Sequence, residues 1–164
     1  MSEVSEESRR TLNNDAAMAS PSRTGRVSVI IPALDEEDAI GSVMREIPRP
    51  PVSDVIVVDN GSTDRTAEVA RGHGATVVRE EQRGYGSACL RGIAALPDDT
   101  RVVVFLDGDH SDFPEQIPEL IAPIANDEAD MVIGSRALGD CEIGSLTPVQ
   151  VFGNWLACTL MRVI

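Results

Sequence analysis

Two aspartates separated by one glycine follow an apolar run of the chain. Residues 102–106 are Val-Val-Val-Phe-Leu, and Asp107, Gly108 and Asp109 come directly after them. Side chains two positions apart on an extended segment point the same way, so both carboxylates can reach one ion, and the glycine leaves room for a ligand. Hard oxygen ligands select Mg²⁺ or Mn²⁺, which often bind through one or two carboxylates together with phosphate oxygens. The spacing therefore predicts a Mg²⁺ or Mn²⁺ site, with an ordinary polar turn as the alternative.

The apolar run itself predicts a strand that is buried on both faces of a sheet, because it is continuous, rich in β-branched residues and bounded by charge. A strand at 27–31 is expected to stop at Pro32, and others are predicted at 54–58, 75–78 and 130–133. Helices are predicted between them, at 35–47, 66–71, 86–96 and 114–125. This alternation predicts an α/β domain with a mainly parallel sheet and helices on both faces.

Polar residues follow four of the predicted strands, namely Asp35, Asp59, Asp107 and Arg136. Ligands of parallel α/β sheets bind outside the carboxyl ends of the strands. We therefore expect these four positions to converge on one binding site. The acids at 35–38 have a second interpretation as the first turn of the following helix, where the helix dipole favours negative charge.

The segment Arg83-Gly84-Tyr85-Gly86 precedes the helix predicted at 86–96. Its glycines resemble part of a dinucleotide-binding fingerprint. That interpretation is rejected, because the third position is Cys89 and the fingerprint belongs at the first strand-to-helix turn of a chain. A loop that lets backbone amides and Arg83 approach a phosphate remains as the functional alternative.

Composition excludes several classes of function. The 164 residues suffice for one domain, and 27 acids against 14 bases, all of them arginine, give a formal charge of −13. Such a surface repels nucleic acid, so no nucleic-acid partner is expected. Three cysteines without a CxxC pair indicate free thiols in a reducing compartment. Because the N-terminus also lacks an apolar leader, the expected location is the cytoplasm.

The two ends of the chain differ from its middle. Residues 1–25 lack apolar periodicity and are expected to form a disordered tail. Residues 149–164 are nearly all apolar but shorter than the roughly 20 residues that span a bilayer. They are expected either to pack in the core or to contact a membrane surface, which would place the protein at the cytoplasmic face. The sequence stops inside this segment without a helix-capping signal, which indicates C-terminal truncation.

Four motifs occur in the order found in one known family: VSVIIPALDEE, VIVVDNGSTDRT, VVVFLDGDHSDFPEQIP and MVIGSR. Over residues 27–164 the chain resembles family 2 glycosyltransferases of the GT-A fold, in particular those similar to dolichol-phosphate mannosyltransferase and other polyprenyl-phosphate sugar transferases. The resemblance implies that residues 26–164 form a nucleotide-sugar-binding domain whose C-terminal part is missing.

The resemblance also implies roles for individual residues. Pro32, Leu34 and Glu36 would line the nucleotide pocket, and Asp59 and Asn60 would lie near the base. Asp107, Gly108 and Asp109 match the DxD motif, which holds the metal and the diphosphate. Ser111 matches a position that can complete the metal shell, and Arg136 matches an arginine that contacts the phosphates. Asn60 departs from the family, which often has a second Asp there.

The implied activity is inverting transfer of a sugar from a nucleotide-diphosphate sugar, UDP- or GDP-linked, to an acceptor such as a polyprenyl phosphate, with Mg²⁺ or Mn²⁺ as cofactor. The catalytic base is expected beyond Ile164. The alternative is a truncated domain that binds sugar nucleotide and metal but transfers nothing. A haloacid-dehalogenase-type phosphatase also has D-x-D after an apolar strand, but Ser111 and the absence of lysine oppose that interpretation.

Overall fold

The computed structural model describes residues 25–135. The tail expected at the N-terminus therefore lies outside the described residues, apart from Gly25. So do Arg136 and the apolar segment at 149–164. Contacts divide the chain into two compact units, Met1–Val132 and Ile133–Ile164. Of the second unit only residues 133–135 are described, and they form neither helix nor strand.

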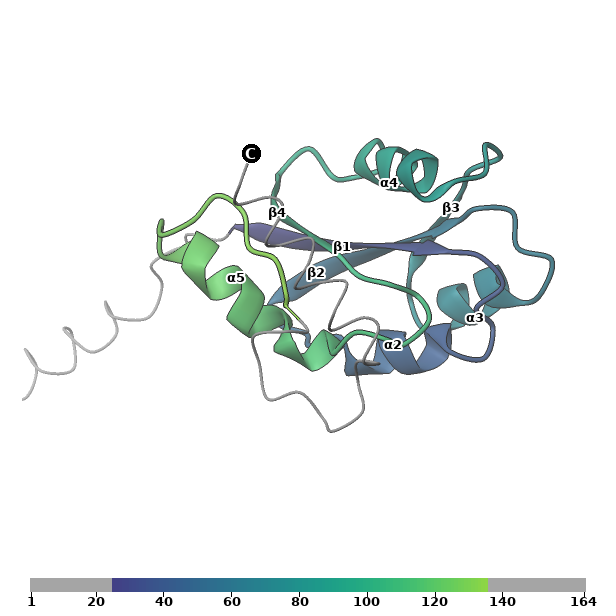
Figure 1. Cartoon of the computed structure of the whole chain (residues 1–164), viewed down its shortest axis with the longest axis horizontal. Coiled ribbons are helices and arrows are strands. Elements are labelled where there is room, and N and C mark those ends of the chain that lie inside the picture. The colour runs from purple at the N-terminus through teal and green to yellow at the C-terminus, as the bar shows by residue number, and fades with distance from the viewer. Residues whose placement is uncertain (1–24, 136–164) are drawn as a thin grey trace, which may run out of the picture. The chain divides into compact units, whose positions relative to one another are not determined.

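A four-stranded sheet forms the centre of the first unit. Its strands are β1 (Arg26–Ala33), β2 (Val52–Asp59), β3 (Thr76–Arg79) and β4 (Thr100–Phe105). They lie in the order β3-β2-β1-β4, and every neighbouring pair is parallel. Because parallel strands need crossover connections, the intervening helices lie against the faces of the sheet, as Figure 1 shows. The predicted α/β class with a parallel sheet is confirmed.

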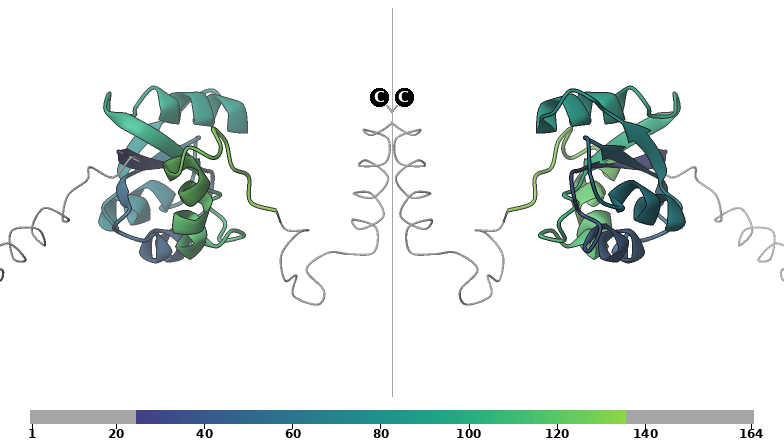
Figure 2. Two further views of the ribbon diagram at one scale, coloured as in Figure 1. Left: turned by 90° about the vertical axis from the view of Figure 1, so that its left-hand side faces the viewer. Right: turned by 90° about the vertical axis from the view of Figure 1, so that its right-hand side faces the viewer.

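The helices form two layers of unequal size. On one face, α2 (Ile40–Glu46), α3 (Thr66–Gly72) and α5 (Ile117–Ala125) close a large core; the 3₁₀ turn η1 (Pro114–Gln116) leads into α5. On the other face, α4 (Tyr85–Ile93) packs alone over β1 and β2 (Figure 2). The first core contains five β-branched residues of β1 and β2 that are at most 2% exposed to solvent: Val27, Val29, Ile31, Val55 and Val57.

Strand β4 is buried on one face only, so the prediction of two-sided burial is wrong. Val102 and Val104 are 5% and 8% exposed, whereas Val103 and Phe105 are 36% and 43% exposed. Phe105 pairs with Ile30 and so faces the α4 side of the sheet, but α4 packs on β1, β2 and β3. No described helix covers that side of β4.

The predicted strand at 130–133 is also wrong. These residues have no strand pairing among those described, and Met131 is 73% exposed. An apolar run forms a strand only where a neighbouring backbone supplies its hydrogen bonds. The run alone did not contain that information.

Pro32 does not end its strand, contrary to the sequence prediction. β1 continues to Ala33, and Pro32 pairs in register with Val58 of β2. In a parallel strand the N–H and C=O of alternate residues face the same neighbour. The Ile30 carbonyl accepts the Leu106 N–H, so the backbone of Ile30 faces β4. The position of the missing N–H of Pro32, two residues further along, therefore also faces the β4 side. β4 has already ended there, because its last paired residue is Phe105. The proline therefore removes no ladder hydrogen bond.

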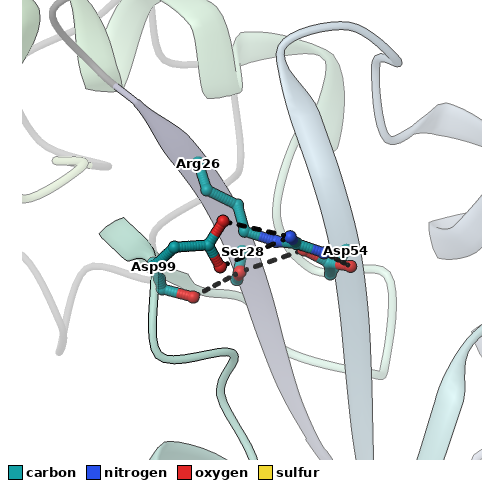
Figure 3. A network of polar contacts seen from close by, with 5 residues as sticks. Arg26, Ser28, Asp54 and Asp99 are labelled. Carbon is teal, nitrogen blue, oxygen red and sulfur yellow. Dashed lines mark hydrogen bonds and ion pairs between the residues drawn. The ribbon is translucent and has the colours of Figure 1, made fainter.

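A polar network ties the strands together at their amino ends, opposite the site described below. Arg26 donates through Nη2 to Asp54 Oδ1 at 2.8 Å and also contacts Asp99, and Ser28 lies between these groups (Figure 3). The hydrogen bond from Arg26 lowers the pKa of the Asp54 carboxyl.

Within residues 25–135, no helix is long and apolar enough to cross a membrane.

Candidate functional site

A pocket opens at the carboxyl ends of β1, β2 and β4. Its volume is about 380 Å³, within the range of roughly 300–1,000 Å³ usual for small-molecule sites. The following residues line it: Pro32, Ala33, Leu34, Glu36, Asn60, Arg83, Gly84, Tyr85, Ala88, Asp107, Gly108 and Asp109. All of them belong to the first unit of the chain.

Most of the residues predicted for the site line this pocket. Pro32, Leu34, Glu36, Asn60, Asp107, Gly108 and Asp109 do so. Asp59 and Ser111 do not appear among the lining residues. Asp59 is 6% exposed, and its carboxylate accepts the Ser62 N–H at 2.8 Å, which closes the turn after β2. Arg136 is outside the part of the chain that the structure describes.

The segment 107–112 is a tight loop held by its own carboxylates. Asp109 Oδ1 accepts the Ser111 N–H at 2.9 Å, and Asp112 Oδ2 accepts the Asp107 N–H at 3.2 Å. His110 adopts a left-handed backbone conformation with φ of 62°, and its Nε2 lies 2.8 Å from Glu46 Oε2 on α2. The loop is therefore anchored both internally and to a helix, which fixes where Asp107 and Asp109 stand.

Negative charge is concentrated beside this loop. The pKa of the Glu36 carboxyl is raised, first by burial and then by the charges of nearby acids, of which Asp109 is the strongest and Asp107 also acts. Repulsion of this kind is relieved when a cation binds among the carboxylates. The residues therefore fit a divalent ion.

The number of protein ligands for such an ion is small. Among residues 25–135, no three His, Cys, Asp or Glu side chains are grouped closely enough to hold a metal by themselves. Mg²⁺ usually binds through one or two carboxylates, with water and substrate phosphates at its other positions. Asp107 and Asp109 suit that mode of binding better than a cage made only of protein groups.

Two of the acids at 35–38, Asp35 and Glu37, connect two loops rather than cap a helix. α2 begins at Ile40, so the expectation that they occupy its first turn is wrong. Asp35 Oδ1 accepts the Thr63 N–H at 2.6 Å, and Glu37 Oε2 accepts the Arg65 N–H at 3.0 Å. Both contacts bind the β1–α2 loop to the β2–α3 loop. They thereby fix the pocket wall that carries Leu34 and Glu36.

Another wall of the pocket comes from the β3–α4 loop and the first residue of α4, of which only Arg83 was predicted near a ligand, as an alternative phosphate contact. Arg83, Gly84 and Tyr85 lie at the pocket, and Arg83 Nη2 donates to the Gly61 carbonyl at 3.2 Å. The only signal in the sequence was the pair of glycines ahead of a helix. Gly84 has φ of 131°, which explains why a glycine stands at that turn.

Asn60 joins this loop to the end of β2. Its Nδ2 donates to the carbonyls of Glu80 and Gln82 at 3.1 and 2.8 Å, and its Oδ1 accepts the Gly84 N–H at 2.8 Å. The Asn60 side chain therefore holds three backbone groups of the loop while it lines the pocket.

The first turn of α4 places an uncharged aromatic group near the aspartates. Burial raises the pKa of Tyr85, and the charges of Cys89 and Asp107 raise it further. The Cys89 thiol also has a raised pKa, chiefly through burial. Both groups are consequently protonated at neutral pH.

Sequence comparison identifies related proteins. A sequence model of the family described as Glycosyl transferase family 2 matches residues 28–162. A dolichyl-phosphate hexose transferase of Haloferax volcanii is 40% identical over 114 residues, which are 67% of this chain and 47% of that protein. The first curated relatives are matched over 54% and 48% of their own lengths, so this chain spans about half of them.

Structure comparison points the same way. Glucosyl-3-phosphoglycerate synthase of Mycobacterium tuberculosis has been crystallised with Mn²⁺, uridine diphosphate and glucosyl-3-phosphoglycerate. It matches with a TM-score of 0.56 and 35% identity, over 62% of this chain and 40% of that one. A second crystal structure of that enzyme contains Mg²⁺ and uridine diphosphate.

Proposed function

The chain belongs to glycosyl transferase family 2 and has an α/β fold that matches GT-A enzymes, and from this premise we propose that its pocket binds a nucleoside-diphosphate sugar for transfer to an acceptor. The observation that carries the proposal is the pocket itself, about 380 Å³ in volume, which Asp107 and Asp109 of one anchored loop line together with residues at the end of β1. Sites at the carboxyl ends of parallel strands commonly receive nucleotides.

Each wall of the pocket would take one part of the ligand. Asp107 and Asp109 would hold Mg²⁺ or Mn²⁺ next to the diphosphate, since both lie in the loop whose charge, after burial, helps to raise the pKa of Glu36. Pro32, Leu34 and the β3–α4 loop form the remaining surface, on which the nucleoside would lie. Arg136 and the Ser111 hydroxyl remain proposals for phosphate and metal contacts.

When bound, the cation neutralises charge that develops on the diphosphate as the bond to the sugar breaks. The lone pair of an acceptor oxygen forms the new bond to the anomeric carbon on the face opposite the diphosphate, which leaves with the electrons of the old bond, so the configuration inverts. A phosphate acceptor is already anionic and has no proton to lose. An alcohol acceptor would need a positioned base.

Two features of relatives favour particular ligands. UDP occupies the mycobacterial synthase together with Mn²⁺ or Mg²⁺, which favours a UDP-linked donor. The relative from Haloferax volcanii is a dolichyl-phosphate hexose transferase, which favours a polyprenyl phosphate as acceptor. A GDP-linked donor is the alternative, and so is a domain that binds sugar nucleotide without transferring it.

Thermal-shift measurements test the binding proposal. A ligand that binds only the folded state raises the melting temperature by mass action. The full chain is heated with UDP-, GDP- and dTDP-sugars, each with and without Mn²⁺. We expect an increase for a UDP-sugar that depends on Mn²⁺, and no increase with any of the nucleotides would refute the proposal.

The Asp109→Asn variant tests whether Asp109 binds the metal. The amide keeps an oxygen that can accept the Ser111 N–H but removes the negative charge that would face the metal. We expect the Mn²⁺-dependent increase to disappear while the melting temperature without ligand stays close to that of the wild type. Glu119→Gln, which neutralises an exposed acid on α5 away from the pocket, is the control and should bind as the wild type does.

Transfer of a radiolabelled sugar from the nucleotide to a polyprenyl phosphate separates the two functional alternatives. Labelled lipid indicates a transferase. Binding without labelled lipid or free sugar would favour the domain that only binds.

A further inference from the structure

The hydrogen-bonding capacity of the Asn60 side chain is almost fully used within the protein. An asparagine amide offers two N–H donors and one carbonyl oxygen. Both donors of Asn60 go to backbone carbonyls, of Glu80 and Gln82, and its oxygen accepts the Gly84 N–H. A bound nucleotide would therefore find no free donor on this side chain, although the residue is at the pocket.

The orientation of the amide is fixed by these partners. If the amide were turned over, its oxygen would face two carbonyl oxygens and its NH₂ group would face the Gly84 N–H. All three contacts would then be repulsive. Asn60 is also held at its backbone, because its N–H donates to the Ala33 carbonyl at 2.9 Å. The side chain thus projects from a rigid strand end into the β3–α4 loop.

We propose that Asn60 is a positioning residue, which sets the wall formed by Arg83, Gly84 and Tyr85 and through it the fit of the nucleotide. Asn60 forms hydrogen bonds with the loop on both sides of Arg83: with the carbonyls of Glu80 and Gln82 before it, and with the Gly84 N–H after it. Arg83 is thereby held where its guanidinium reaches the Gly61 carbonyl at the mouth of the pocket. This inference rests on the proposed nucleotide site but assigns Asn60 no contact with the base.

Aspartate at this position gives a chemically specific test. Asn60→Asp keeps an acceptor for the Gly84 N–H but turns the second oxygen, charged at neutral pH, toward the carbonyls of Glu80 and Gln82. Protonation at low pH restores one O–H donor. The variant should therefore regain part of its function as the pH falls, whereas a residue that only fills space would show no such recovery.

The experiment measures Mn²⁺-dependent UDP affinity at pH 8 and at pH 5 and expresses each variant as a ratio to the wild type at the same pH. We expect Asn60→Asp to bind about tenfold more weakly at pH 8, because the Glu80 and Gln82 carbonyls lose their donor, with a smaller ratio at pH 5. Asn60→Ala should bind UDP more weakly than the wild type at both pH values. Asn126→Asp, the same change at a site outside the pocket, should match the wild type.

Amide hydrogen exchange at Gly84 provides a readout independent of the nucleotide. Its exchange should accelerate in Asn60→Ala, which removes the acceptor of the Gly84 N–H, after correction for intrinsic rates. Equal ratios at both pH values, or an unchanged Gly84 amide, would overturn the positioning role. If the wild type bound no nucleotide, the proposed function would fail, and the exchange at Gly84 would still decide whether Asn60 holds the loop.

Discussion

Glu36 shows how one residue reports the electrostatics of the site. Its pKa lies above the usual value of 4.5 because of burial and because of nearby carboxylates, including those of Asp109 and Asp107. The folded protein therefore keeps the Glu36 proton to a higher pH than the unfolded chain does. By linkage, the stability of the metal-free protein falls as the pH rises through this interval, and the full penalty is present above it.

Replacing the Glu36 carboxylate by a neutral amide should remove this loss of stability. We expect Glu36→Gln to be more stable than the wild type at pH 7 without metal, by about 0.5 kcal/mol, because partial exposure weakens the interaction. The difference should vanish well below pH 4.5, where Glu36 is protonated in both states. Denaturant unfolding across pH measures it, with Glu119→Gln as the control. A variant less stable than the wild type at pH 7 would contradict the account.

Residue types predicted one part of the site better than the other. Asp107 and Asp109 stood out in the sequence because charge directly follows an apolar strand. Arg83 was predicted only as an alternative phosphate contact and Tyr85 had no predicted role, since their approach to the pocket depends on contacts of Asn60, which is 24 positions from Gly84. A contact at that sequence separation leaves no local pattern.

Among the elements, α4 depends on one close packing contact. A Cβ added at Gly92 would lie 2.5 Å from Ile30 Cγ2 and 3.2 Å from Val58 Cγ2. Ile30 is fully buried, and its branched side chain has little freedom to move away. The glycine therefore allows α4 to lie directly on β1 and β2, and this position carries Tyr85 to the pocket.

Gly92→Ala should push the helix outward. We expect the free energy of unfolding to fall by about 1–3 kcal/mol, as in other overpacked cores, and nucleotide binding to weaken with it. Gly86→Ala lies in the same helix with nothing within 4 Å of the added carbon, so it should be neutral or slightly stabilising. Chemical denaturation of the two variants gives the comparison, and equal stabilities would argue against the packing account.

The order of strands and helices followed from periodicity, but their ends and surroundings did not. Pro32 stayed in β1 because its missing donor faces the side on which β4 has ended. β4 was expected to be buried on both faces, yet α4 packs on β1, β2 and β3 instead. Both outcomes depend on which elements become neighbours. Local sequence carries little of that information.

On the scale of the whole molecule, the charge is the dominant property. The formal charge of −13 makes the chain repel itself, which opposes compaction. We expect added NaCl to raise the melting temperature between about 0.05 and 0.5 M and then to level off, because the Debye length has become shorter than most charge separations. Differential scanning calorimetry measures this effect, and a melting temperature that falls in NaCl would contradict it.

The fold class and the parallel sheet followed from the alternation of predicted strands and helices, and the family from motif order, while the site walls needed the three-dimensional arrangement. The motifs after β1, β2 and β4 meet because parallel strands end at one edge. The β3–α4 loop carries none of the four motifs, and it joins them through its hydrogen bonds with Asn60.

All lining residues of the pocket lie between Pro32 and Asp109. Because these residues belong to one continuous segment of the chain, the proposed sugar-nucleotide site can be exchanged as a single block. A chimera that exchanges this block with the corresponding block of a relative should inherit the relative's choice of activated sugar.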